Sequence, residues 1–451
     1  MDNPRAFLKS FFQAVSDKPL DADDDRYVGI YADTTALRDD PVKLLARAIE
    51  YSPGESVQLL SGFRGTGKST ELKRLEARLV AEGYQVVFLN MDHYVNTSTP
   101  IDVSDFLMTL AGAFGDVLQA PEHLGKDPTR ESYWDRFSAF LTRTNITFSE
   151  MAGSLAGVTI KANLKSDPTF RQNLQKHMAG HLGALVADIH QFLEDCVKSL
   201  KAKHGEETQI VLLVDSLEHI RGSFINARQV QESVELLFAG HAEKLRLPNI
   251  HVVYIVPPYL KVRAPNLGML YGGGALQIFP AIKIRGDDGN AHAVGVEAIK
   301  LIVARRGEWR ELLGGDQQLE GLIHMSGGNI RDLLRLLTEV IRRASYNDLP
   351  VSDQVVEDAI NQMRLEFLPI ADDDAEWLAQ IAETHDASFK DMDQLPDLTR
   401  FFDTHLVLCY RDGPEWYDVH PLIKDHVIKQ AKLIKARRQR KESERPGAAS
   451  G

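Results

Sequence analysis

The chain has 451 residues, a formal net charge of −12 at pH 7 and 43% hydrophobic residues, which is the composition of an ordinary globular protein. Its acidity makes it a poor overall match for nucleic acid, so any such binding needs a local basic patch. No run approaches the roughly 18 apolar residues of a membrane span, the N-terminus lacks a signal-peptide pattern, and only two cysteines are present, which together favour a cytoplasmic protein without a disulfide scaffold or a membrane partner.

The first part of the chain alternates helical and strand patterns. Amphipathic spacing predicts the helices, and short apolar runs predict buried strands. This alternation is typical of an α/β fold with a parallel sheet. The predicted elements are, in chain order, a helix over 4–15, a helix over 41–52, a strand over 57–61, a helix over 70–83, a strand over 84–91 and a helix over 103–118.

A segment at about 122–205 is too long for a simple connection, so we interpret it as an insertion. Within it the pattern predicts a hairpin over 146–164 and a helical run over 168–201. The strand expected next is almost wholly apolar, as in a sheet that is covered on both faces. Further strands are predicted over 210–215, 250–256 and 276–284.

The C-terminal third changes character twice. A helical pattern runs from about 289 to 368, and two helices and two short strands joined by a turn follow it, which together suggest a winged-helix module over 369–430. The basic stretch at 431–451 is predicted to be a disordered tail. Two interpretations of this tail stay open: a solvated helix end that frays, or a contact with nucleic acid or an acidic partner.

A phosphate-binding loop is predicted between the strand at 57–61 and the helix that follows. Residues 62–69 match G-x-x-x-x-G-K-[ST] in strand–loop–helix context. Glycines let backbone N–H groups ring a phosphate, and the helix places its positive end below it. Lys68 is expected to bridge the β- and γ-phosphates of ATP, and Ser69 to hold Mg²⁺. The predicted nucleotide-binding residues of this segment are Gly62, Arg64, Gly65, Thr66, Gly67, Lys68, Ser69 and Thr70.

An acid at the end of a buried strand is the second expected part of the site. Asp215 follows an apolar run and is predicted to ligate the same Mg²⁺ as Ser69, the alternative being a structural turn cap. Ser216 stands where many P-loop ATPases have a glutamate, so Glu218 is the candidate base that orients water. The competing interpretation pairs Glu218 with Arg221. This departure favours slow hydrolysis.

Over about 40–430 the chain resembles the AAA+ ATPases, and among them the STAND-type signalling and origin-recognition-like ATPases. The resemblance rests on the loop at 62–69 and on two later segments, SGGNIRDLLRLL at 326–337 and WYDVHPLIKDHV at 416–427. It implies that Arg331 is the second-sensor arginine, directed at the γ-phosphate. It also implies that His420 contacts the β-phosphate of bound ADP and locks a closed state.

Each of these residues also has a structural interpretation. Arg331 would then be a surface arginine paired with an acid, and His420 a core histidine. Arg263 lies where AAA+ proteins often carry an arginine finger for a neighbouring subunit, so the resemblance implies a homo-oligomer; a surface role for Arg263 is the alternative.

The expected fold is therefore α/β: a three-layer P-loop NTPase sheet with a helical lid and a C-terminal winged-helix domain. The predicted parts are an N-terminal helical segment at 1–50, the ATPase core at 51–288 with its insertion, the lid at 289–368, the winged helix at 369–430 and the tail at 431–451.

Three functions fit this reading. The main hypothesis is a slowly hydrolysing ATPase that acts as a nucleotide-dependent switch on a partner effector, for which the resemblance implies a setting in bacterial antiviral defence. The alternative is a DNA-associated ATPase of initiator or loader type, which binds duplex through the winged helix and the basic tail. The third is a scaffold that binds ATP without turning it over.

Overall fold

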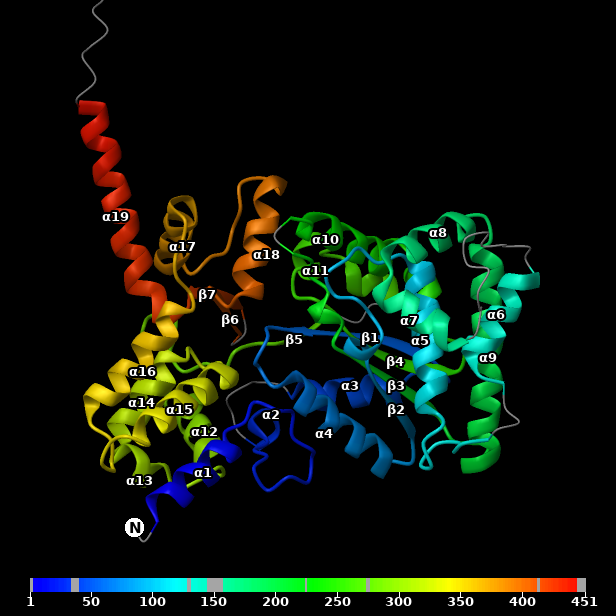
Figure 1. Cartoon of the computed structure of the whole chain (residues 1–451), viewed down its shortest axis with the longest axis horizontal. Helices are drawn as coiled ribbons and strands as arrows, with labels where there is room; N and C mark the ends of the chain where they lie inside the picture. Colours follow the sequence, from blue (N-terminus) through cyan, green and yellow to red (C-terminus); the bar gives the residue numbers. More distant parts are fainter. Residues whose placement is uncertain are drawn as a thin grey trace, which may run out of the picture. The chain divides into compact units, whose positions relative to one another are not determined.

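The computed structural model describes residues 3–33, 40–127, 131–143, 157–223, 225–272, 276–411 and 414–443 (Figure 1). The chain divides into two compact units. One unit holds the sheet and its insertion, and the other gathers the N-terminal segment, the phosphate-binding loop and the C-terminal elements. The first unit comprises Pro41–Ser61 and Glu71–Ile278, and the second Met1–Asp40, Gly62–Thr70 and Phe279–Gly451.

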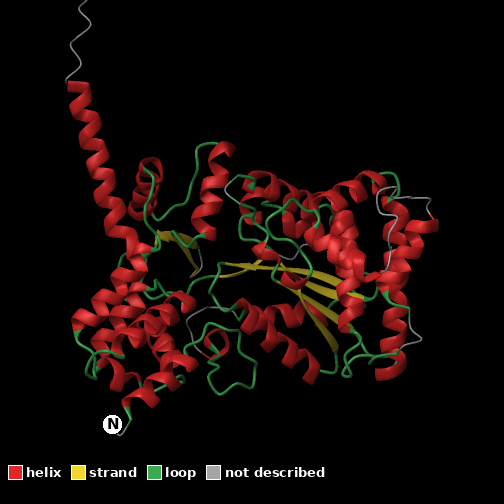
Figure 2. Ribbon diagram, viewed as in Figure 1, coloured by secondary structure: helices red, strands yellow, loops and turns green. Residues whose placement is uncertain are grey.

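The sheet unit is built on five strands in the order β2-β3-β4-β1-β5. The pairings of β1 with β4, β4 with β3 and β3 with β2 are parallel. Every residue of β3 and β4 is buried, and helices lie on both sides of the sheet (Figure 2). The predicted three-layer α/β fold is therefore confirmed. The strands are β1 Ser56–Gly62, β2 Gln85–Asn90, β3 Ile210–Asp215, β4 Ile250–Ile255 and β5 Gln277–Phe279.

Helices make up the rest of this unit, including the described part of the insertion. The hairpin predicted over 146–164 is wrong where it can be checked, because 157–164 lies in helix α7, and 146–156 lies outside the described residues. The run predicted over 168–201 is two helices that break after Met178. The longer helices are α3 Pro41–Glu50, α4 Lys68–Ala81, α5 Val103–Val117, α6 Tyr133–Arg143, α7 Gly157–Ser166, α8 Pro168–Met178, α9 Leu182–His204 and α10 Ala227–Glu235; the short ones are η1 Met91–His93, η2 Leu217–His219, η3 Leu236–Gly240, η4 Ala242–Leu245, α11 Leu260–Arg263 and η5 Leu267–Tyr271.

The second unit contains the lid, whose central helix is α15. Its apolar residues recur at helical spacing and form one buried face, and the N-terminal helix α1 packs against it. The helices are α1 Pro4–Ala14, α2 Ile30–Asp33, α12 Ala293–Ala304, α13 Trp309–Leu313, α14 Asp316–Met325, α15 Ile330–Ala344 and α16 Asp353–Leu365.

The same unit contains the predicted winged helix, whose hairpin is formed by antiparallel pairing of Val407 with Val419 through Arg411 with Glu415. The tail prediction needs correction, since α19 continues to Ser443 and residues 431–443 are therefore helical. No helix in the described ranges is long and apolar enough to cross a bilayer. The elements are α17 Asp372–Thr384, η6 Met392–Gln394, α18 Leu395–Asp403, β6 Val407–Arg411, β7 Glu415–Val419 and α19 Pro421–Ser443.

Candidate nucleotide-binding site

The phosphate-binding loop has the geometry that its sequence predicts. It connects β1 to α4, and Gly65 and Gly67 adopt left-handed φ values of 84° and 90°. Glycine adopts this backbone region at little cost, whereas residues with a Cβ do not. The Thr66 hydroxyl and the Lys68 ammonium each donate to the carbonyl oxygen of Phe63, at 2.9 Å in both cases. These contacts hold the loop in a tight turn, with Lys68 largely buried inside it.

The N-terminal segment also supports this loop. The Tyr31 hydroxyl donates to the backbone carbonyl of Thr66 at 3.0 Å, and the Tyr31 ring packs edge-on against Phe279 with 5.1 Å between the ring centroids. The N–H of Leu20 donates to the Thr70 hydroxyl at 3.2 Å. Neither Tyr31 nor Leu20 was predicted from the sequence, because both lie outside any motif and more than thirty positions from their partners.

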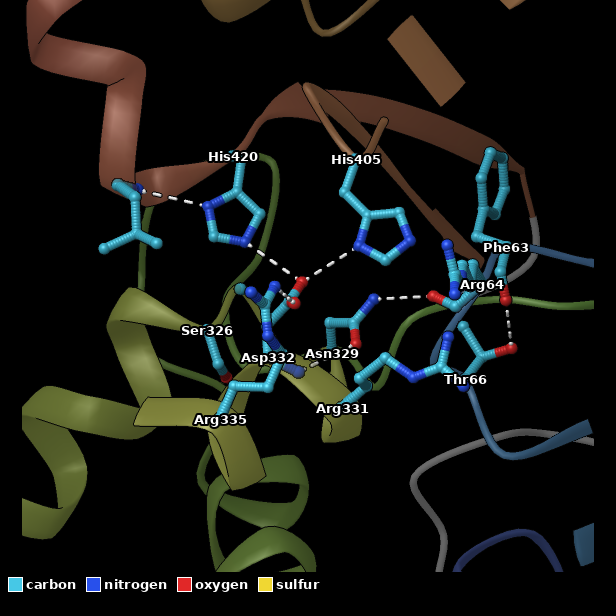
Figure 3. A network of polar contacts seen from close by, with 12 residues as sticks. Phe63, Arg64, Thr66, Ser326, Asn329, Arg331, Asp332, Arg335, His405 and His420 are labelled. Atoms are coloured by element: carbon cyan, nitrogen blue, oxygen red, sulfur yellow. Dashed lines mark hydrogen bonds and ion pairs between the residues drawn. The ribbon is translucent and has the colours of Figure 1, made fainter. Parts of the chain in front are cut away.

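The lid also contacts the loop (Figure 3). Asn329 directly precedes α15 and is fully buried; its side-chain oxygen accepts from the N–H of Asp332 at 3.2 Å and so caps the helix. Its amide donates to the carbonyl of Arg64 at 2.9 Å, and the N–H of Arg331 donates to the carbonyl of Gly65 at 3.3 Å. Two successive loop carbonyls are thus bonded to one end of one lid helix.

Gly65 is required for this contact as well as for the turn. A Cβ built at Gly65 would lie 2.3 Å from Oδ1 of Asn329 and 2.7 Å from Cβ of Arg331. Both distances are far below van der Waals contact. The absence of a side chain at Gly65 therefore lets α15 approach the loop backbone.

Arg331 lies in the first turn of α15, as predicted for the second sensor. Its Nε lies 3.3 Å from a carboxylate oxygen of Asp17, and the side chain is 28% exposed. In the part of the chain that the structure describes, its Nη1 is buried and has no hydrogen-bond partner. A buried guanidinium N–H without an acceptor is costly, and the guanidinium fork suits the oxygens of carboxylates and phosphates.

Asp332, the next residue, binds two histidines of the winged helix (Figure 3). Its carboxylate accepts from Nδ1 of His405 at 3.0 Å, and Nε2 of His420 lies 3.5 Å from the same oxygen. Burial alone would raise the pKa of Asp332, but the hydrogen bonds and charges of His405 and His420 hold that pKa far below its usual range. Asp332 is therefore an ionised carboxylate inside the protein, between α15 and the winged helix.

His420 lies beside the first turn of the lid helix α15, next to Asp332. His420 is fully buried, its ring packs on Phe367 with 4.9 Å between centroids, and its Nδ1 accepts from the N–H of Leu422 at 3.3 Å. Burial lowers the pKa of His420, and Asp332 partly opposes that shift. In this packing His420 reaches the phosphate-binding loop through Asp332 and α15, so the predicted contact with the β-phosphate of ADP requires the packing to change.

The winged helix also contacts the loop directly. Phe63, the second loop residue, is buried, and its ring packs edge-on against Phe402 of α18 with 5.2 Å between centroids. The sequence offered one signal for this contact, an aromatic residue within a Gly-rich loop. The loop thus touches the N-terminal segment, the lid and the winged helix.

The predicted acids follow β3 in the sheet unit. Asp215 is 4% exposed and accepts from the N–H of Ser216 at 2.8 Å, and Ser216 adopts a left-handed φ of 73°. Glu218 lies in the short turn η2, where Nδ1 of His219 lies 2.8 Å from a carboxylate oxygen of Asp92. The strands β3 and β1 both pair in parallel with β4, so their carboxyl ends lie at the same edge of the sheet.

The oxygen donors predicted for Mg²⁺ suit that ion. A serine hydroxyl and a carboxylate are hard ligands, and Mg²⁺ commonly combines one or two such groups with waters and nucleotide phosphates. Among the residues that the structure describes, no cluster of three or more histidines, cysteines and acids could hold a metal. Ser69 and Asp215 stay the predicted ligands, with the nucleotide expected to complete the set.

Arg263, the predicted arginine finger, forms an ion pair within its own unit. Its Nε lies 2.6 Å from a carboxylate oxygen of Glu235, and its side chain is 10% exposed. An action on a neighbouring subunit would require Arg263 to leave Glu235.

A scan against protein-family models finds no match, and no curated protein matches the chain. Among solved structures, the chain is similar to the ORC2 protein of Aeropyrum pernix in its ADPNP–ADP complexes, with 14% identity and a TM-score of 0.40 over 91% of this chain and 98% of that one. It is also similar to Cdc6p of Pyrobaculum aerophilum, with 12% identity and a TM-score of 0.38 over 87% and 93% of the two chains. At these values the likeness assigns no activity, so the site residues carry the functional argument.

Proposed function

We propose that the chain binds ATP with Mg²⁺, hydrolyses it slowly, and acts as a switch whose lid and winged helix respond to the nucleotide at residues 62–70. The observation that carries this proposal is that the start of α15 contacts both the phosphate-binding loop and the winged helix. Asn329 and Arg331 bond the carbonyls of Arg64 and Gly65, while Asp332 holds the winged-helix histidines. A shift of the loop backbone is therefore transmitted to the winged helix through one turn of helix.

The predicted roles at the phosphates follow from the residue types. Lys68 would supply a positive charge at the β- and γ-phosphates, and the guanidinium of Arg331, which faces Asp17 in this structure, would pair with the γ-phosphate. Ser69 and Asp215 would hold Mg²⁺, which neutralises charge on the phosphate oxygens when it is bound. Glu218 is the candidate that orients water, and its place in a turn beyond Ser216 is consistent with slow turnover.

The switch is energetically feasible. Moving an equilibrium from 1:99 to 99:1 takes about 5.5 kcal/mol of differential affinity. Charge-assisted contacts contribute roughly 1.5–3 kcal/mol each, so a γ-phosphate that engages Lys68 and Arg331 supplies free energy of that order. The output would act on a partner effector protein; a role in antiviral defence rests on the sequence resemblance alone.

The nucleotide claim is tested by calorimetric titration of the chain with ATP and ADP in the presence of Mg²⁺, followed by measurement of phosphate release. We expect binding of both nucleotides and slow release of phosphate. Lys68→Ala should abolish high-affinity binding, because it removes the buried ammonium. Equal heats for the native chain and Lys68→Ala would refute nucleotide binding at this loop.

A DNA-associated ATPase is the second candidate, and α19 favours it. This helix ends in a run of exposed cations beyond the winged helix. A helix of this charge can contact duplex phosphates, and such contacts make affinity fall with rising salt. The test measures binding to duplex DNA over a range of salt concentrations. Affinity that falls steeply with salt, and falls less steeply after four of the exposed cations are changed to glutamine, would support this function. No binding at low salt would exclude it. The exposed cations are Lys429, Lys432, Lys435, Arg437, Arg438, Arg440 and Lys441.

A further inference from the structure

The segment that follows helix α1 contacts two parts of the candidate site. Asp17 lies 3.3 Å from Nε of Arg331, and the N–H of Leu20 donates to the Thr70 hydroxyl at 3.2 Å. Asp17 and Leu20 are three positions apart. One short stretch of chain therefore contacts both the predicted sensor and the helix that carries Lys68.

The N–H groups of Arg331 have three different environments. Its backbone N–H is bonded to Gly65, its Nε faces Asp17, and its Nη1 is buried without an acceptor among the described residues. A guanidinium presents several donors in a fixed fork, so it can exchange one oxyanion for another without changing its own position. Asp17 is the oxyanion present in this structure.

Asp17 has room to leave Arg331. Its side chain is 54% exposed, and it lines a cavity of about 370 Å³ together with Phe12 and Val15 and with residues of α15 and α16. The carboxylate can therefore turn away from Arg331 without displacing buried side chains. Backbone contacts such as that of Leu20 with Thr70 need not break.

We propose that Asp17 is a residue that sets the preference between ATP and ADP, because it occupies Arg331 until a γ-phosphate replaces it. This inference rests on the proposed function. ADP lacks the γ-phosphate and leaves the Asp17–Arg331 pair intact, whereas ATP must break the pair and bring a second anion close to Asp17. Asp17 therefore lowers the affinity for the triphosphate selectively. The Asp17 side chain is released from Arg331 only in the ATP state.

The test compares Asp17→Asn with Asp23→Asn. Both substitutions remove one negative charge from the same N-terminal loop, and Asp23 is exposed, so the second variant controls for a general change in charge. Dissociation constants are measured for ADP and for a non-hydrolysable ATP analogue, each with Mg²⁺. Since exposed ion pairs are weak, we expect Asp17→Asn to tighten the triphosphate about two- to fivefold and to leave ADP within about twofold. Asp23→Asn should change neither.

A second comparison assigns the effect to Arg331. In an Arg331→Ala background, Asp17→Asn should no longer change the ratio of the two dissociation constants, because the pair is already broken. An unchanged ratio in Asp17→Asn alone, or an equal change in Asp23→Asn, would overturn the role of Asp17 while nucleotide binding stands. A native chain that binds neither nucleotide would overturn the proposed function and this inference together.

Discussion

The side-chain amide of Asn329 donates to the backbone carbonyl of Arg64 at 2.9 Å, which joins the first residue before lid helix α15 to the phosphate-binding loop. The same side chain caps α15 through the N–H of Asp332. The position of the loop and the position of the helix are therefore fixed by one buried residue, which makes Asn329 the most direct place to separate nucleotide binding from its transmission.

Asn329→Ser is expected to uncouple nucleotide binding from the response of the winged helix. Serine is a good N-cap residue, so α15 should keep its start, but its shorter side chain cannot donate to the carbonyl of Arg64. We expect the variant to bind nucleotide with less than tenfold weaker affinity and to lose the nucleotide-dependent change in the winged helix. Tryptic cleavage after Arg411, an exposed residue at the end of β6, measured with and without nucleotide, would detect this loss. A variant that responds as the native chain does would show that Asn329 is not the connection.

Gly65→Ala is expected to prevent the lid from docking. The new Cβ meets Asn329 and Arg331, and the left-handed backbone at φ 84° adds a cost of about 1–2 kcal/mol. Gly83→Ala is the matched control: Gly83 has φ 90° and no atom within 4 Å of a built Cβ, so it reports the backbone cost alone. The free energy of unfolding measured in urea and the affinity for nucleotide should both fall much further for Gly65→Ala than for Gly83→Ala. Equal effects of the two substitutions would contradict the contact.

Acid is expected to loosen the second unit through His420. The folded-state pKa of His420 lies below its unfolded value of 6.5, so this group's contribution to stability is full above pH 6.5 and is lost as the pH falls below it. The pKa of Asp332 is also lowered, so its contribution is present above about pH 3.8 and is lost at lower pH. Unfolding free energies measured from pH 7.5 to pH 5 should therefore decline.

His420→Gln tests the contribution of His420 to the loss of stability below pH 6.5, since glutamine does not titrate. The variant is expected to be less stable at pH 7.5 but to show a flatter decline between pH 6.5 and pH 5. ADP should also dissociate faster from it, as expected if His420 stabilises the closed state. A decline as steep as that of the native chain would assign the acid sensitivity to another group.

In the sheet unit, we expect Asp105 to make stability fall as the pH rises, the opposite of the effect of His420. It lies on the buried helix α5, accepts from the Gln175 amide at 2.6 Å, and burial raises its pKa to about 7. The unfolded chain ionises this group near pH 3.8, so its contribution to stability is full below that value and is lost as the pH rises to about 7. Asp105→Asn should therefore gain stability relative to the native chain between pH 4 and pH 7. Denaturant midpoints at both pH values measure the difference.

The parts of the site that could be predicted from the sequence are those that depend on local residue patterns. The turn at 62–69 and the strand end at Asp215 each depend on residues within a few positions of one another, and residue type and spacing determine them. The short strands of the wing were predicted for the same reason. The hairpin at 146–164 was wrong over its described part, because a short stretch of mixed apolar and polar residues fits a helix as well as a strand.

The contacts between distant segments could not be predicted in this way. Asp17 meets Arg331, Phe63 meets Phe402, and Asp332 meets His405 across separations that no periodicity encodes. Asp332 follows Arg331 directly in the sequence, but its burial and its contact with His405 place it at the centre of the winged-helix contact. Only the packing of the second unit shows that its lid and winged helix contact the same loop.

The most direct test of the account is hydrogen exchange of residues 395–422, measured on the full chain without nucleotide, with Mg²⁺ and ADP, and with Mg²⁺ and a non-hydrolysable ATP analogue. We predict that the backbone amides around His405 and His420 exchange differently in the ADP and ATP states, and that Lys68→Ala abolishes the difference. Identical exchange in the two states, in a chain shown by calorimetry to bind both nucleotides, would contradict the claim that the winged helix responds to the phosphate-binding loop.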